Sequence, residues 1–144
     1  MAKPTTNHLF RIGLPPGWTD GTVHFFQGPN DGGERPVLSL SIDETTETND
    51  LQEFARERVE NALASFPQAE LVQEDTVNTE NGSDVQVAVI RYGEPGAGSM
   101  FKKMYFLMPG RSGYTFIATL NKRQMKTVAL QVDEMVKRFN PSGQ

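Results

Sequence analysis

The chain has 144 residues, of which 37% are apolar and 22% charged, and its formal net charge is −4. This composition predicts one globular domain over residues 1–144 and excludes a disordered polyelectrolyte. The absence of cysteine excludes a disulfide scaffold and a thiolate metal site, and the acidic balance argues against electrostatic binding of nucleic acid.

No apolar run approaches the ~20 residues of a membrane-spanning helix. The N-terminal stretch Met1–His8 lacks the apolar segment of a signal peptide. We therefore expect a cytoplasmic protein that does not insert into a membrane.

Three short strands separated by turn residues are predicted in the first third of the chain. Pro15-Pro16-Gly17 stops the first strand, and a loop rich in Gly, Pro, Asn and Asp follows the second. The predicted ranges are His8–Leu14, Gly21–Gln27 and Val37–Asp43.

A first helix follows, because apolar residues recur at three- and four-residue steps from Leu51 to Phe66. Asp50 can cap it, Glu53 stands at the spacing of a capping box, and Pro67 ends it. Four more strands are expected at Glu70–Thr76, Asp84–Tyr92, Met100–Met108 and Tyr114–Leu120.

A last helix is predicted from Asn121, whose capping partner is Gln124, to the region of Phe139. The order βββ-α-ββββ-α indicates an α+β fold, an antiparallel sheet with two helices on one face.

Several predicted strands carry apolar residues on both sides. In the strand over 84–92, Val85, Val87 and Val89 alternate with Ala88, Ile90 and Tyr92, and the strand over 100–108 repeats the pattern. If both helices cover one face, the other face is an open apolar surface, which is typical of a partner site. Dimerisation, or a sheet that curls on itself, remains an alternative explanation.

Catalytic and metal-binding patterns are weak. His8 and His24 are the two histidines, both lie in predicted strands, and neither belongs to a metal-binding motif. We expect no enzyme activity, no metal and no cofactor.

The segment Leu14-Pro-Pro-Gly-Trp-Thr-Asp-Gly-Thr-Val23 resembles the opening of the DcrB-related domain family, in particular its Eag branch. The resemblance continues through Leu38–Asp43, from Phe54 to Pro67, and at Phe101–Leu107 and Tyr114–Leu120.

That resemblance implies a PsbP-like fold, a homodimer and a chaperone role. Eag chaperones of type VI secretion bind the N-terminal transmembrane helices of effectors that carry a PAAR domain, and shield them before loading on the secretion spike. The alternative is a DcrB-like accessory protein for envelope or complex assembly that binds a soluble partner. DcrB itself resembles an envelope lipoprotein, and we expect this chain to depart from that branch, because its N-terminal stretch is not signal-like and it contains no cysteine for lipidation.

The resemblance also implies a client-binding groove on the sheet with a contribution from the first helix. At two of the matching positions, Arg58 and Met104, the family tends to have glutamine, so polar contacts there would differ. The matching positions are Val23, Phe25, Ser39, Ser41, Arg58, Phe66, Met104 and Ile117.

Overall fold

A computed structural model describes residues 3–7, 10–18, 21, 23–29, 35–43, 46, 48–94 and 98–141. The predicted strand residue His8 lies outside these ranges. The strands are β1 (Lys3–Asn7), β2 (Phe10–Leu14), β3 (Val23–Gln27), β4 (Val37–Asp43), β5 (Glu70–Asn78), β6 (Asp84–Gly93), β7 (Ser99–Leu107) and β8 (Gly113–Asn121). The helices are α1 (Leu51–Ser65) and α2 (Val128–Lys137), with a 3₁₀ turn, η2, at Gln124–Lys126.

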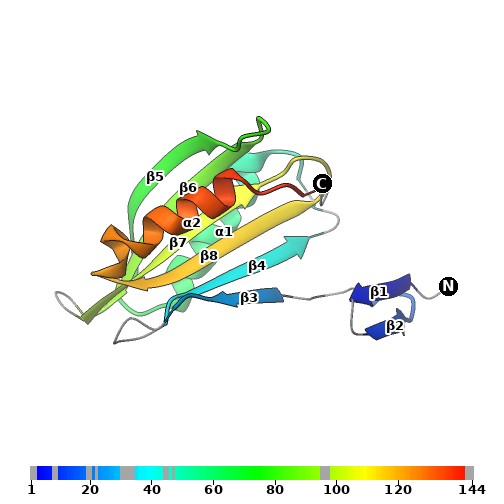
Figure 1. The fold of residues 1–144 in the computed structure, drawn as a ribbon, viewed down its shortest axis with the longest axis horizontal. Helices are drawn as coiled ribbons and strands as arrows, with labels where there is room; N and C mark the ends of the chain where they lie inside the picture. Colours follow the sequence, from blue (N-terminus) through cyan, green and yellow to red (C-terminus); the bar gives the residue numbers. More distant parts are fainter. Residues whose placement is uncertain are drawn as a thin grey trace.

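Six strands form one antiparallel sheet in the order β3-β4-β8-β7-β6-β5. The α+β class and the antiparallel sheet are therefore as predicted. The first predicted strand is not part of this sheet, because β2 pairs with β1 in a separate two-stranded hairpin that lies apart from the main body (Figure 1).

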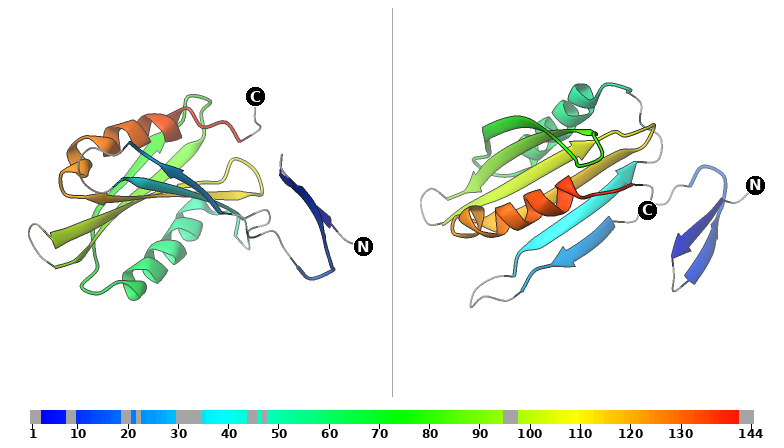
Figure 2. Two further views of the ribbon diagram at one scale, coloured as in Figure 1. Left: turned by 60° about the horizontal axis from the view of Figure 1, so that its bottom comes forward. Right: turned by 45° about the horizontal axis from the view of Figure 1, so that its top comes forward.

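The two helices lie on opposite faces of the sheet (Figure 2). The prediction that both would cover one face was wrong. On β6, Val85 and Val87 pack in the cluster that contains α2, whereas Ala88 and Ile90 pack in the cluster that contains α1. The strands are apolar on both sides because each face has a helix to pack against.

Side chains at the start of α1 form a capping network. The Asp50 side chain accepts a hydrogen bond from the Gln52 amide at 2.9 Å. Thr48, rather than Glu53, binds the Asp50 amide, and the Thr48 hydroxyl donates to the Glu53 carboxylate at 3.2 Å. The helix therefore begins where predicted, but Thr48 accepts the hydrogen bond from the Asp50 amide that was expected to go to Glu53.

The predicted pair Asn121 and Gln124 does form a reciprocal box. The backbone amide of Gln124 donates to the side-chain oxygen of Asn121 at 2.8 Å, and the backbone amide of Asn121 donates to the side-chain oxygen of Gln124 at 3.0 Å. This box leads into the turn η2, so α2 begins at Val128, later than expected.

Polar contacts join α2 to the sheet. The hydroxyl of Tyr105 donates to Asp133 of α2, and the Lys103 ammonium lies 2.8 Å from the same carboxylate. In addition to these bonds, Val132 and Val136 of α2 pack against apolar residues of the sheet.

The two edges of the sheet differ. β5 is exposed along its whole length, carries Glu70, Glu74 and Asp75, and has a register shift between Leu71 and Gln73. Edge strands are commonly protected from unwanted pairing by such charges and bulges. β3 is also exposed throughout, but its sequence VHFFQ contains no acidic residue, lysine or arginine.

Candidate functional site

Helix α1 covers only part of its face of the sheet. It packs mainly on β6 and β7, whose Ala88, Ile90, Met104 and Phe106 form its core cluster, and Ile117 of β8 packs against that cluster. The same face of β3, β4 and part of β8 extends beyond the helix. We call this region the open sheet surface and define it by Val23, Phe25, Ser39, Ser41 and Ile117.

Strand register places these five side chains on one face. Phe25 lies opposite Ser39, Ser39 opposite Ile117, and Ile117 opposite Met104. Residues directly opposite one another in a ladder point to the same side, and residues two apart on a strand share that side. Val23 pairs with Ser41, two residues along the same strands from Phe25 and Ser39, so this pair lies on the same face.

The members of the open sheet surface differ in exposure. Phe25 is 69% exposed and Val23 40% exposed, although both are large and apolar. Ser39, Ser41 and Ile117 are half-buried. An exposed phenylalanine beside two hydroxyls and an isoleucine makes a mixed surface that can bury apolar area and also satisfy a few polar groups.

Met104 lies on the same face but is 3% exposed, because α1 packs on top of it. In this structure it supports Ile117 and α1 from beneath, and does not present a surface to a partner.

Arg58 borders the open sheet surface near the N-terminal half of α1. Its guanidinium carbon lies 3.7 Å from the centroid of the Phe54 ring, and it forms an ion pair with Asp43 at the end of β4. A further bond of 3.3 Å runs from Arg58 to the Phe54 carbonyl. The guanidinium is thus held in place by its own chain.

Phe66 lies at the other end of the helix, where its ring packs on Tyr92 with a centroid separation of 4.6 Å. The Lys102 ammonium is 5.3 Å from the Phe66 ring and donates to the Thr119 hydroxyl at 2.7 Å. Burial lowers the pKa of Lys102 below its ordinary value.

The matching positions therefore fall into three groups in space. Five form the open sheet surface, Arg58 and Phe66 lie at the middle and just beyond the carboxyl-terminal end of α1, and Met104 lies beneath the helix. Sequence reasoning missed Lys102, although it shares the even-numbered side of β7 with Met104. Lys102 was missed because only the apolar residues of that strand were considered.

The backbone of β3 has a free side. The Gly28 amide donates to the Pro36 carbonyl at 2.8 Å, in line with the β3–β4 register. Because hydrogen-bonded and non-bonded pairs alternate in an antiparallel ladder, Phe26 bonds β4 while Phe25 directs its amide and carbonyl outward.

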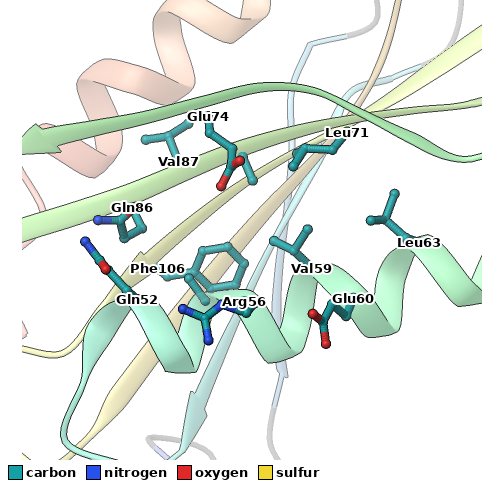
Figure 3. Close-up of a pocket in the computed structure, with 12 residues that line it drawn as sticks. Gln52, Arg56, Val59, Glu60, Leu63, Leu71, Glu74, Gln86, Val87 and Phe106 are labelled. Carbon is teal, nitrogen blue, oxygen red and sulfur yellow. The ribbon is translucent and has the colours of Figure 1, made fainter.

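A cavity of about 530 Å³ lies on the other side of α1, between the helix and β5 (Figure 3). Phe106 and Val59 line it, together with the charged residues Arg56, Glu60 and Glu74. This mixture of charges suits an apolar partner less well than the open sheet surface does.

Within the described residues, no group of three or more His, Asp or Glu side chains could hold a metal ion. His24 is exposed on β3. No helix in the same described ranges is long and apolar enough to cross a bilayer.

A family model described as DcrB matches residues 11–137. A search of curated proteins gives no match. Among solved structures, the protein of unknown function PA94 from Pseudomonas aeruginosa has a TM-score of 0.75 at 13% identity, with 97% of this chain and 96% of that chain covered.

Two further structures share the fold. Cyanobacterial PsbP (CyanoP) from Synechocystis has a TM-score of 0.54 at 16% identity, covering 96% of this chain and 91% of its own. The Ran-binding protein Mog1p from Saccharomyces cerevisiae has a TM-score of 0.51 at 15% identity, covering 97% and 86%. These similarities show a PsbP-like fold.

Proposed function

Because the chain belongs to the DcrB family, we propose that it is a non-enzymatic chaperone or adaptor that binds apolar helices of a secreted protein. In the form implied by the resemblance to Eag chaperones, the clients are N-terminal membrane-spanning helices of a type VI effector with a PAAR domain. The chaperone shields them in the cytoplasm until the effector is loaded.

The observation that carries this proposal is the exposure of Phe25 and Val23 beside the half-buried Ile117. Burying an apolar side chain of this size contributes roughly 1.5–3 kcal/mol, so leaving a row of them in water is costly unless a partner covers them. Ser39 lies between Phe25 and Ile117, Ser41 lies beside Val23, and both small side chains allow a helix backbone to approach closely.

The dimensions of the surface fit one helix. β3, β4 and β8 have five, seven and nine residues, which at ~3.4 Å each gives about 17–30 Å, the length of a helix of roughly 11–20 residues. The three strands β3, β4 and β8 at ~4.8 Å spacing provide a strip about 10–15 Å wide, close to the diameter of a helix with its side chains.

A homodimer is part of the proposal. A membrane-spanning helix is apolar all round, whereas one open sheet surface with α1 at its side covers only part of its circumference. A second copy of the chain would cover the side that faces away from α1.

The test is co-expression with the N-terminal, helix-containing fragment of an effector encoded beside this gene, followed by purification and measurement of size and mass. Phe25→Asp and Ile117→Asp place a charge on the open sheet surface and should each lower recovery of the fragment at least tenfold. Phe25 is mostly exposed, so its substitution leaves the core intact.

Leu130→Asp is the matched control, because Leu130 is 63% exposed and lies on α2, on the other face. It should leave recovery of the fragment unchanged. Full recovery with both surface variants, or equal loss with Leu130→Asp, contradicts the proposed site. If the chain does not retain the helix-containing fragment but co-purifies with a folded soluble protein that has no apolar helices, the accessory-protein alternative is favoured.

A further inference from the structure

We propose that Lys102 binds the carboxyl-terminal end of the helix held on the open sheet surface and thereby fixes the direction in which that helix lies. This inference rests on the proposed function, and it adds a specificity-determining residue that the sequence resemblance does not include.

Lys102 is held in one position but is incompletely paired. Its ammonium donates to Thr119 at 2.7 Å and lies 5.3 Å and 5.8 Å from the ring centroids of Phe66 and Tyr92. Among the described residues, no carboxylate lies within 4.0 Å of it. An ammonium has three donors, so two remain for an acceptor from outside.

The register places Lys102 at one end of the open sheet surface. Neighbouring strands pair Lys102 with Thr119, Thr119 with Val37, and Val37 with Gln27. This row lies two residues along the strands from the row that contains Phe25 and Ile117. The carboxyl-terminal end of α1, followed by Phe66, lies beside it.

The opposite end has the opposite charge balance. Asp43, Glu53 and Glu57 together with Arg58 line a cavity of about 450 Å³ next to the N-terminal half of α1. Within this lining, three carboxylates and one guanidinium leave a net negative charge. The surface is therefore positive at Lys102 and negative near Asp43.

A helix is complementary to such a surface in one direction. Its last four carbonyls have no partner within the helix, and its dipole places roughly half a negative charge at that end and half a positive charge at the other. The carboxyl-terminal carbonyls should lie at Lys102 and the amino-terminal amides near Asp43. The carbonyls are the natural acceptors, because membrane-spanning segments seldom carry carboxylates.

This direction is parallel to α1, which runs from the Asp43 end towards Lys102. The interaction between the parallel dipoles of α1 and the bound helix is unfavourable, but it involves only half charges at the helix ends. Lys102 and the acidic end carry full charges. The charged side chains should therefore set the direction.

The absence of native cysteine permits a clean test by disulfide cross-linking. Gln27→Cys marks the Lys102 end, and Val23→Cys lies on the same exposed strand about 14 Å away, near the middle of a bound 20-residue helix. The probes are two synthetic 20-residue Leu–Ala helices, acetylated and amidated, with one cysteine near either the amino or the carboxyl terminus. Gln27→Cys should favour the carboxyl-terminal probe about fivefold, and Val23→Cys is the control position that should not distinguish the two probes.

Lys102→Met should bring the ratio at Gln27→Cys close to one, and Lys102→Glu should reverse it. The exposed Lys122→Met is the control and should leave this ratio unchanged. A ratio of one at Gln27→Cys with Lys102 present, or a ratio that persists in Lys102→Glu, overturns the inference while the cross-links themselves support the proposed function. Absence of cross-linking at both positions overturns the proposed function as well.

A third probe separates helix carbonyls from a carboxylate. It is the carboxyl-terminal cysteine peptide with a free rather than amidated terminus. A preference that appears only with this probe means that Lys102 recognises a carboxylate, and it overturns the assignment to the helix end.

Discussion

Gly113 of β8 lies directly beneath the ring of Phe54 of α1, so close that a β-carbon at this position would overlap the ring. This contact holds the N-terminal half of α1 against the edge of the open sheet surface.

Gly113→Ala should therefore displace Phe54 and destabilise the fold by about 2–3 kcal/mol, within the range for overpacking a well-filled core. Urea unfolding at 25 °C would measure the loss. Gly110→Ala is the control, because nothing lies within 4 Å of a β-carbon there, and it should change stability by less than about 0.5 kcal/mol. Equal effects would mean that Phe54 does not pack on β8.

Arg58→Gln should lower the free energy of unfolding by about 1 kcal/mol, because it removes both the contact with Phe54 and the ion pair with Asp43. Arg56→Gln, at an exposed position of the same helix that borders the cavity beside β5, should have at most half that effect. The comparison is made by denaturant unfolding of both variants. A neutral Arg58→Gln would show that its guanidinium is not held in this way and is available to a partner.

Proline substitutions should distinguish the two sides of the β3 backbone. Phe26→Pro removes an amide that bonds β4 and should cost about 2–3 kcal/mol more than Phe26→Ala. Phe25→Pro removes an outward amide and should lie within about 1 kcal/mol of Phe25→Ala. If the two prolines are equally destabilising, the inferred alternation of the ladder is wrong.

Alkaline pH should weaken the attachment of α2. Burial, followed by the hydrogen bond to Asp133 and its charge, raises the pKa of Tyr105 above its ordinary value of about 10. Above pH 10 the unfolded chain loses this proton and the folded chain keeps it, so the unfolding free energy falls as pH rises, by up to about 1.4 kcal/mol per pH unit.

Tyr105→Phe should remove this slope, and the difference between the two proteins isolates Tyr105 from the other groups that titrate in the same range. Thermal unfolding measured from pH 8 to 11 would show it. Parallel pH profiles would mean that the Tyr105 hydroxyl is not buried beneath α2 in solution.

Local periodicity was sufficient to predict the strands of the sheet and the two helices, and the order of these elements predicted that the sheet is antiparallel. It was not sufficient to place the helices. Val87 and Ala88 each indicate a buried face, and the pattern is the same whether a helix or a partner covers that face. Only the tertiary structure separates these cases.

The candidate site was predictable in the same partial way. Phe25, Ser39 and Ile117 share a face because strand register follows the pattern of alternation. The burial of Met104 depends on where α1 crosses the sheet, and the pairing of Arg58 with Asp43 joins residues 15 positions apart. Neither relationship has a local sequence signal.

The unequal protection of the two sheet edges limits how large an assembly can become. An added strand is opposed at β5 by its carboxylates and irregular register, whereas the described residues of β3 carry no such protection. If two molecules join through β3, each uses its single receptive edge, and no edge is left for a third. Association of this kind stops at a pair and cannot polymerise into a fibre, even while the sheet presents uncovered phenylalanine to the solvent.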